Sequence, residues 1–146
     1  MPVNMKAADE KLGVSSNISD FVVPVGATIN MDGTALFQCV TTLFLAQVYG
    51  IDLAMGELAL LILTIVGASV GTPAIPGGGV IILAPVLSGA GIPTEGLIMI
   101  IGIDRILGML RTTINVTGDL TACAVFHKWF GNERSDNVSV KEQVVE

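Results

Sequence analysis

The sequence is poor in charged and in aromatic side chains. Only 14% of its 146 residues are charged and 5% are aromatic, whereas soluble domains carry about 25% charged residues. The mean hydropathy is +0.74. This composition argues against a soluble globular domain and predicts an integral membrane protein. The net charge of −6 offers no basic surface for nucleic acid, so no nucleic-acid partner is expected.

Cysteine and histidine are also scarce, which removes several kinds of chemistry. Cys39 and Cys123 lie in apolar runs without CxxC or Cys/His spacing, so we expect neither a disulfide nor a cysteine metal site. His127 is alone at the end of the last apolar run, and the sequence offers no nucleophile–base pair. The glycine-rich segment 71–79 lacks the Gly-Lys-Ser/Thr ending of a phosphate loop. The sequence therefore does not predict an enzyme.

Three long apolar runs are present, and polar residues interrupt the first. The run 21–49 is broken by Asn30-Met31-Asp32-Gly33-Thr34. Non-helical backbone at that depth is tolerated only where it lines a cavity, so the pattern predicts a discontinuous transmembrane helix. The alternative is a kinked helix in which Asp32 bonds a neighbour.

The second run, 57–92, is longer than the roughly 20 residues of one membrane span. Two prolines and four glycines between Gly71 and Gly79 cannot continue a helix. The run therefore predicts a re-entrant helical hairpin that enters and leaves on the same side.

The third run, 97–126, carries charges that a span normally excludes. At about 100° per residue, five positions share one stripe about 80° wide: Asp104, Gly108, Arg111, Asn115 and Asp119. Charges within a span mark a ligand path, so this helix is predicted to bind something small and charged. The alternative is a set of structural ion pairs between helices. Arg105 falls off the stripe and is predicted to snorkel or pack.

The distribution of lysine and arginine predicts the orientation. Both the polar lead-in 1–20 and the tail 127–146 carry basic residues, whereas the loops 50–56 and 89–96 have none. The positive-inside rule then places both ends in the cytoplasm. The sequence thus predicts an all-α protein of the cell (inner) membrane, with a broken helix, a hairpin and a last helix within 21–126.

Three signatures together resemble the dicarboxylate/amino acid:cation symporter family, which includes the glutamate transporters. They are Asn30-Met31-Asp32-Gly33-Thr34, the proline/glycine hairpin tip, and Arg111-Thr112-(x)2-Asn115-Val116-Thr117-Gly118-Asp119. The resemblance covers about Ser15 to Lys128 and implies half of an inverted-repeat transport domain. It also implies a homotrimer in membrane lipid.

The resemblance implies a substrate site around Arg111, whose planar guanidinium suits a carboxylate. The other substrate-binding positions that it implies are Thr34, Ile75, Gly79, Gly108, Thr112 and Asn115. Met31 would lie between ion and substrate sites and, with Asp104, would take part in coupling.

The resemblance also implies three sites for Na+, with H+ not excluded. The first site would use Asp119 with the carbonyls of Gly26, Asn30 and Asn115. The second would use Asp32 with the Asn30 side chain. The third would use the backbone carbonyls of Thr28, Ser69, Val70 and Thr72. Hard cations prefer such carboxylate and carbonyl oxygens.

Gly108 departs from the family pattern, because amino-acid-transporting members commonly have an Asp there that binds the substrate amino group. We therefore expect a preference for succinate, fumarate or malate over glutamate or aspartate. Asp104, one turn away, could replace the missing carboxylate. The hairpin tip also departs from the family pattern, because it has Pro73 and Ala74 where small residues and glycine are expected.

The family's further helices and its first, serine-rich hairpin are not in this sequence, and half a transport domain cannot work alone. We expect a truncated record of a longer chain; a gene remnant or a partner chain that supplies the rest are the alternatives. The rival from another class is a non-transporting membrane component whose polar stripe only packs helices.

Overall fold

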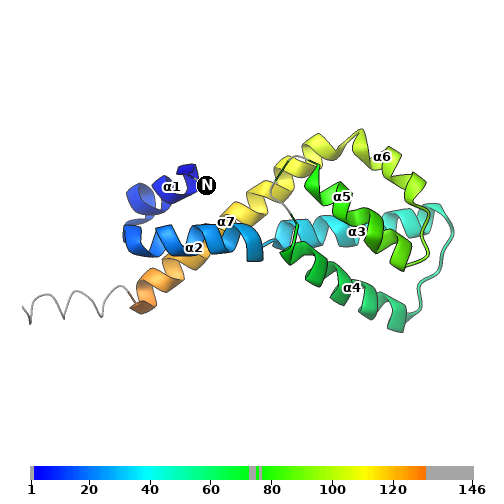
Figure 1. The fold of residues 1–146 in the computed structure, drawn as a ribbon, viewed down its shortest axis with the longest axis horizontal. Coiled ribbons are helices and arrows are strands. Elements are labelled where there is room, and N and C mark those ends of the chain that lie inside the picture. Colours follow the sequence, from blue (N-terminus) through cyan, green and yellow to red (C-terminus); the bar gives the residue numbers. More distant parts are fainter. Residues whose placement is uncertain (1, 73–74, 76, 131–146) are drawn as a thin grey trace, which may run out of the picture. The chain divides into compact units, whose positions relative to one another are not determined.

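The computed structural model describes residues 2–72, 75 and 77–130, and every regular element in that part is helical. Pro73, Ala74, Pro76 and the tail from 131 lie outside the described residues. The helices are α1 (Pro2–Leu12), α2 (Ser16–Ile29), α3 (Asp32–Val48), α4 (Met55–Val70), α5 (Gly78–Gly89), the 3-10 turn η1 (Thr94–Gly96), α6 (Leu97–Ile101) and α7 (Asp104–Phe130) (Figure 1). The predicted all-α class is confirmed.

The chain divides into two compact units. Unit 1 comprises Met1–Gly26 and Val116–Glu146, and its described part contains α1, most of α2 and the second half of α7. Its core consists of Ala8, Val14, Val22, Val23 and Cys123. At the α1–α2 corner, Asp9 accepts hydrogen bonds from the hydroxyls of Ser16 (3.2 Å) and Ser19 (2.5 Å). These bonds fix the turn between the first two helices.

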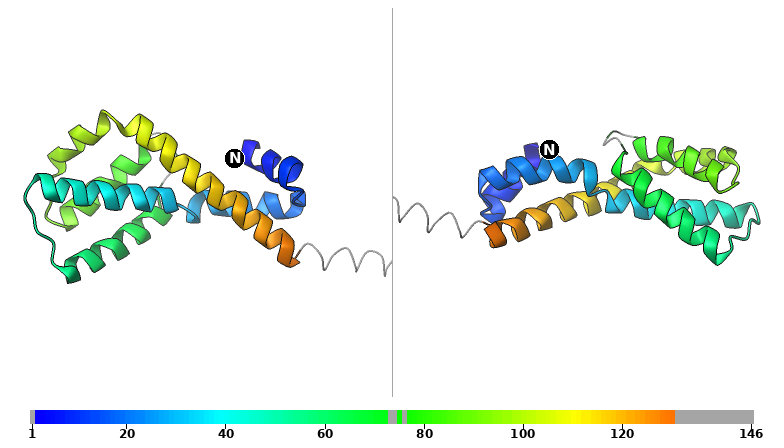
Figure 2. Two further views of the ribbon diagram at one scale, coloured as in Figure 1. Left: turned by 180° about the vertical axis from the view of Figure 1, so that it is seen from behind. Right: turned by 60° about the horizontal axis from the view of Figure 1, so that its bottom comes forward.

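Unit 2 comprises Ala27–Asn115 and holds α3 to α6 with the start of α7. α3 packs against both α4 and α5, which also pack against each other (Figure 2). Leu45, Ile65, Leu83 and Leu87 are fully buried members of one apolar cluster. Their burial removes apolar surface from water, which is the main stabilising term of such a core.

The predicted break in the first run is shorter than expected. Only Asn30 and Met31 lie outside the helices, and α3 begins at Asp32, so Gly33 and Thr34 form its first turn. The first N–H groups of a helix lack intrahelical partners. Here the carbonyl oxygen of the Asn115 side chain accepts the Gly33 N–H at 2.8 Å. This bond from a distant helix allows α3 to begin there, which local sequence could not indicate.

In the second run, α4 and α5 run in opposite directions (Figure 1). α4 ends at Val70 and α5 begins at Gly78 after Gly77, which has φ +78°. Only glycine adopts that backbone conformation readily. At the other end of α4, the Glu57 carboxylate accepts the Ala54 N–H at 2.9 Å and caps the helix.

The third predicted helix, 97–126, is two helices rather than one. α6 ends at Ile101 and α7 begins at Asp104, after a turn at Gly102 and Ile103. Gly102 lowers helix propensity at that point, and Asp104 is an acidic residue in the first turn of α7, where the helix dipole favours it. In the described residues, none of the helices is both long enough and apolar enough to cross a membrane.

Candidate substrate and cation sites

Arg111 lies within unit 2 against residues of α3, α5 and its own helix α7. Its guanidinium carbon is 4.8 Å from the centre of the Phe37 ring on α3, within the range of a cation–π interaction. On α5, a Cβ at Gly79 would collide with Nη1, and on α7 a Cβ at Gly108 would come within 3.5 Å of Nη2. We call Arg111 with Phe37, Gly79 and Gly108 the arginine cradle. Gly79 therefore lets the guanidinium approach the backbone of α5, whereas a Cβ at Gly108 would only be in ordinary van der Waals contact with it.

Asp104 is the counter-ion of the cradle. Its Oδ1 is 3.8 Å from Nη1 of Arg111, and the two side chains are 17% and 11% exposed. The separation exceeds the 2.7–3.2 Å of a hydrogen bond. Within the described residues, neither of these two atoms has a hydrogen-bond partner. Arg111 therefore keeps a donor available for another carboxylate, while a negative charge stays close.

The Asp104–Arg111 ion pair can be compared with the alternative prediction, in which the charges of the third run form ion pairs between helices. Both Asp104 and Arg111 belong to α7, about two turns apart. The pair therefore joins no two helices. The expected stripe is found within unit 2, where Asp104, Gly108 and Arg111 lie on one side of α7.

Asn115 ties α7 to the helix break. Besides accepting the Gly33 N–H, its amide nitrogen donates to the Met31 sulfur at 3.2 Å and to the Thr34 hydroxyl at 3.3 Å. The Thr34 hydroxyl also contacts the Met31 sulfur at 3.6 Å. The structure thus brings together three predicted residues, Met31, Thr34 and Asn115, in one hydrogen-bonded group.

The residues predicted for the first cation site belong to both units. In unit 1, Asp119 is buried at 3% exposure against Gly26, where a Cβ would collide with the carboxylate oxygen. Asn30 and Asn115 belong to unit 2. Gly26 is therefore needed for the close approach of the Asp119 carboxylate to the α2 backbone, whether or not a cation is present.

The residues predicted for the third site lie at the end of α4. Ser69 and Thr72 are buried, and their hydroxyls donate back to the carbonyls of Val66 (2.8 Å) and Ala68 (3.0 Å). The carbonyl of Ser69 accepts the Thr72 N–H at 3.0 Å. The backbone carbonyls at this end of α4, which the prediction assigns to a cation, lie at the negative end of the helix dipole.

Four further predicted residues are exposed: Thr28, Asp32, Ile75 and Thr112. The Thr112 hydroxyl donates to the Gly108 carbonyl at 2.8 Å, inside its own helix. In the part that the structure describes, no three His, Cys, Asp or Glu side chains gather as a metal cluster. Sites built mainly from carbonyl oxygens would not form such a cluster.

Sequence reasoning missed Phe37 and Gly33. Phe37 is 8% exposed and supports Arg111, and a Cβ at Gly33 would collide with the Arg111 carbonyl. Phe37 follows Thr34 at i+3, so it lies near the same face of α3. That spacing could have placed Phe37 near the site, but nothing local points to its contact with Arg111.

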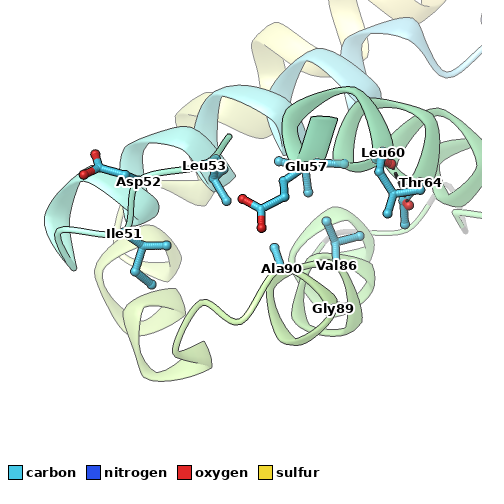
Figure 3. Close-up of a pocket in the computed structure, with 10 residues that line it drawn as sticks. Ile51, Asp52, Leu53, Glu57, Leu60, Thr64, Val86, Gly89 and Ala90 are labelled. Atoms are coloured by element: carbon cyan, nitrogen blue, oxygen red, sulfur yellow. Dashed lines mark hydrogen bonds between the residues drawn. The ribbon is translucent and has the colours of Figure 1, made fainter. Parts of the chain in front are cut away.

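A separate pocket of about 420 Å3 lies at the N-terminal end of α4 and the C-terminal end of α5 (Figure 3). Its lining includes Asp52, Glu57, Leu60, Thr64 and Val86. None of the predicted site residues lines it. The Glu57 carboxylate that faces this pocket already caps α4, so the pocket is not assigned to the predicted substrate site.

The helix break, the antiparallel α4 and α5, and the half-buried arginine define a helical protein with a polar site in its interior. The family model of the sodium:dicarboxylate symporter family matches residues 1–129. The chain belongs to this family. The resemblance found from the three signatures is thereby confirmed.

Known relatives carry the names of transporters. The chain is 45% identical over 122 residues to the proton/sodium-glutamate symport protein of Bacillus subtilis, covering 84% of this chain and 28% of that protein. It is 41% identical over 128 residues to mouse excitatory amino acid transporter 3, with 88% and 24% covered. Human neutral amino acid transporter A is 39% identical over 127 residues, with 87% and 24% covered. The chain spans about a quarter of the length of these relatives.

Proposed function

We propose that this protein is a sodium-coupled symporter that carries an acidic amino acid, glutamate or aspartate, across the cell membrane. Its membership of the sodium:dicarboxylate symporter family and the names of its relatives support transport rather than enzymatic catalysis. The cations and the amino acid are both transported substrates in this proposal, and neither is a resident cofactor.

The arginine cradle is the observation that carries the proposal. Arg111 is 11% exposed, has a free donor atom among the described residues, and is stacked on Phe37. A guanidinium in such surroundings would bind a planar carboxylate through two parallel hydrogen bonds. Thr34, Thr112 and Asn115 would complete the site, with the hairpin backbone at Ile75 and Gly79 closing over the substrate.

The names of the relatives favour acidic amino acids over the C4-dicarboxylates expected from Gly108. Two of the relatives are named for glutamate or for excitatory amino acids. Gly108 has no side chain that could place a carboxylate beside Arg111, whereas Asp104 forms an ion pair with Arg111 at 3.8 Å. We therefore assign the substrate ammonium group to Asp104. Succinate, fumarate and malate are the second candidate class.

The donor chemistry supports Na+ as the coupled ion, although one relative is named for protons as well as sodium. Asp119 and Asp32 are carboxylates, and Gly26, Asn30, Thr28, Ser69, Val70 and Thr72 would add carbonyl or amide oxygens. Hard cations prefer these ligands. Ions that bind carbonyls at the break and at the end of α4 would stabilise the closed, substrate-bound state, and substrate would stabilise the ion sites in return.

In the proposed arrangement α2 and α3 form the discontinuous membrane helix, α4 and α5 the re-entrant hairpin that acts as extracellular gate, and α7 the last span. Non-helical backbone at Asn30 and Met31 is tolerated inside a membrane where it lines a cavity. Both ends of this stretch would face the cytoplasm, and the protein would assemble as a homotrimer in lipid.

Uptake into proteoliposomes tests the proposal. The protein as its gene expresses it is reconstituted, and labelled aspartate uptake is measured with an inward Na+ gradient, with choline, and with a proton gradient alone. We expect Na+-driven aspartate uptake that excess glutamate abolishes. Uptake of succinate that aspartate does not inhibit would instead support the C4-dicarboxylates. A well-folded protein that takes up none of these compounds would support the non-transporting component.

A further inference from the structure

The pocket at the N-terminal end of α4 and the C-terminal end of α5 lies wholly within unit 2 and has a volume of about 420 Å3 (Figure 3). Small-molecule sites are pockets of about 300–1,000 Å3 with mainly apolar walls and a few polar groups. The apolar walls of this pocket are Ile51, Leu53, Leu60, Leu61, Val86 and Ala90. Its size and its lining are therefore those of a site for a small organic molecule.

Glu57 supplies the charged group of the pocket. Its side chain extends from the first turn of α4 into the space beside Ala90 (Figure 3). Oε2 accepts the Ala54 N–H at 2.9 Å, which holds the carboxylate in place. Oε1 has no hydrogen-bond or ion-pair partner in the described part of the chain. The helix cap thus positions the carboxylate and leaves one of its oxygens for a ligand.

The charges around this pocket are all negative. Residues 27–104 contain no Lys, Arg or His, and the ion pairs among the described residues lie within α1 and within α7. Asp52 adds a second carboxylate at the edge of the pocket, pointing away from it (Figure 3). Val86 and Gly89 come from the last turn of α5, whose carbonyl end carries a partial negative charge. The pocket therefore favours a cation.

The apolar walls decide which kind of cation fits. A hard metal ion such as Ca2+ takes about 6–8 oxygen ligands, whereas no three acidic, His or Cys side chains gather within the described ranges. An ammonium group can donate to the Glu57 carboxylate. An apolar body attached to it would remove the walls of the pocket from water. An organic amine meets both requirements, and a metal ion meets neither.

We propose that this pocket binds a small organic amine, whose ammonium group pairs with Glu57 and whose apolar body packs between Leu60 on α4 and Val86 on α5. The pocket shares no residue with the predicted substrate and cation sites. The amine therefore binds apart from the transported substrate, and its binding does not depend on what the protein transports. A ligand held by both helices stabilises the packing of the start of α4 against the end of α5.

Calorimetric titration with three molecules of similar shape tests the charge requirement. Phenethylamine is the cation, phenethyl alcohol the neutral molecule and hydrocinnamate the anion, and the protein is used as its gene expresses it. We expect saturable binding of phenethylamine and at least tenfold weaker binding of the other two. Phenethyl alcohol that binds equally well would overturn the proposal. So would the lack of saturable phenethylamine binding, the result expected if another part of a longer protein fills the pocket.

The position of the bound amine is tested by competition and by a charge variant. Saturating aspartate should leave the phenethylamine affinity unchanged, and competition between the two would place the amine in the substrate site and overturn the proposal. Glu57→Gln removes the charge and keeps an oxygen that can accept the Ala54 N–H. It should weaken phenethylamine binding at least tenfold with nearly unchanged Tm. Glu95→Gln is the control, because Glu95 is an exposed carboxylate outside the pocket, and equal losses in the two variants would contradict the assignment.

Gly89→Leu tests the apolar volume. An added Cβ at Gly89 has no atom within 4 Å, and the rest of the leucine side chain would occupy the pocket that Gly89 lines. Gly67→Leu is the matched control, because Gly67 also has open space around an added Cβ and does not line the pocket. We expect Gly89→Leu to abolish phenethylamine binding and Gly67→Leu to retain it. Undiminished binding by Gly89→Leu would show that the amine does not enter this pocket.

Discussion

Arg111 combines a strong charge with an environment that holds it in one place. The guanidinium stacks on Phe37 at 4.8 Å and is paired to Asp104 at 3.8 Å. A lysine at this position would keep the charge and lose the planar fork and the stacking. Charge alone therefore does not explain why this residue suits a carboxylate.

Arg111→Lys tests whether substrate binding needs the planar guanidinium, which can form two parallel hydrogen bonds to a carboxylate. Hydrogen bonds to charged groups contribute about 1.5–3 kcal/mol each, so we expect aspartate affinity to fall by about 10- to 100-fold while Tm changes little. Titration calorimetry in the presence of Na+ measures the affinity. Arg105→Lys is the control, because Arg105 is exposed on the same helix and belongs to no predicted site. Equal losses in the two variants would contradict a specific role for Arg111.

Asp104→Asn tests whether Asp104 binds the substrate ammonium group. The change removes a negative charge beside Arg111. If Asp104 binds the ammonium, aspartate affinity falls at least tenfold while succinate affinity stays the same or rises. If Asp104 is only the counter-ion of Arg111, the affinities for both compounds rise together. Asp52→Asn, at an exposed carboxylate in the loop before α4, should alter neither.

The start of α3 depends on a close approach that only glycine allows. A Cβ at Gly33 would collide with the Arg111 carbonyl and lie 3.0 Å from Oδ1 of Asn115. Both atoms are on α7, and the Asn115 oxygen is the group that caps α3. The helix break and the proposed substrate site thus meet at this close approach of α3 to α7, beside the contacts of Thr34 with Asn115 and of Phe37 with Arg111.

Gly33→Ala should destabilise the protein by about 1–3 kcal/mol, the usual cost of forcing extra atoms into a packed site. Gly67→Ala is the matched control: Gly67 lies inside α4 with nothing within 4 Å of its added Cβ. There the better helix propensity of alanine should stabilise by about 0.5–1 kcal/mol. Thermal unfolding measures both, and equal shifts would contradict the contact.

Gly79→Ala on α5 should separate binding from stability. Its Cβ would collide with the end of the flexible Arg111 side chain rather than with backbone. The guanidinium can move aside at small cost in Tm, but it then leaves its position in the cradle. We expect aspartate affinity to fall at least tenfold with nearly unchanged Tm. Normal affinity would mean that α5 does not position Arg111.

Periodicity and helix breakers were enough to predict the helical class, the interruption near Asn30 and the two helices α4 and α5 of the second run. They did not predict where α3 begins, because the cap comes from Asn115, far along the chain. They also missed the turn at Gly102, where an apolar run continues across two helices. The start of α3 depends on a tertiary contact, whereas the turn at Gly102 has local signals, in Gly102 and Asp104, that the continuous apolar run concealed.

Part of the candidate site could be predicted from helical periodicity, and the part that depends on tertiary contacts could not. A helical period of about 100° per residue placed Asp104, Gly108 and Arg111 on one side, as found within unit 2. The contacts of Phe37 and Gly33 with α7 join segments far apart in sequence. The roles of Thr34, Asn115 and the cation ligands follow from family resemblance and remain predictions.

At the scale of the whole molecule, the comparison with relatives sets the context of the site. It belongs to the sodium:dicarboxylate symporter family and spans about a quarter of the length of its relatives. The described helices bring together the helix break, the α4–α5 pair and the arginine on which the proposed site depends. In the proposed function, coupling between ion and substrate would join these parts in one mechanism.

The most direct test is the Na+ dependence of aspartate binding to the protein and to its Arg111→Ala variant, by calorimetry at several Na+ concentrations. The account predicts that aspartate binds more tightly as Na+ rises, and that Arg111→Ala abolishes aspartate binding in a protein of nearly unchanged Tm. An aspartate affinity that does not change with Na+ concentration, or aspartate binding that persists in the Arg111→Ala variant, would contradict the account.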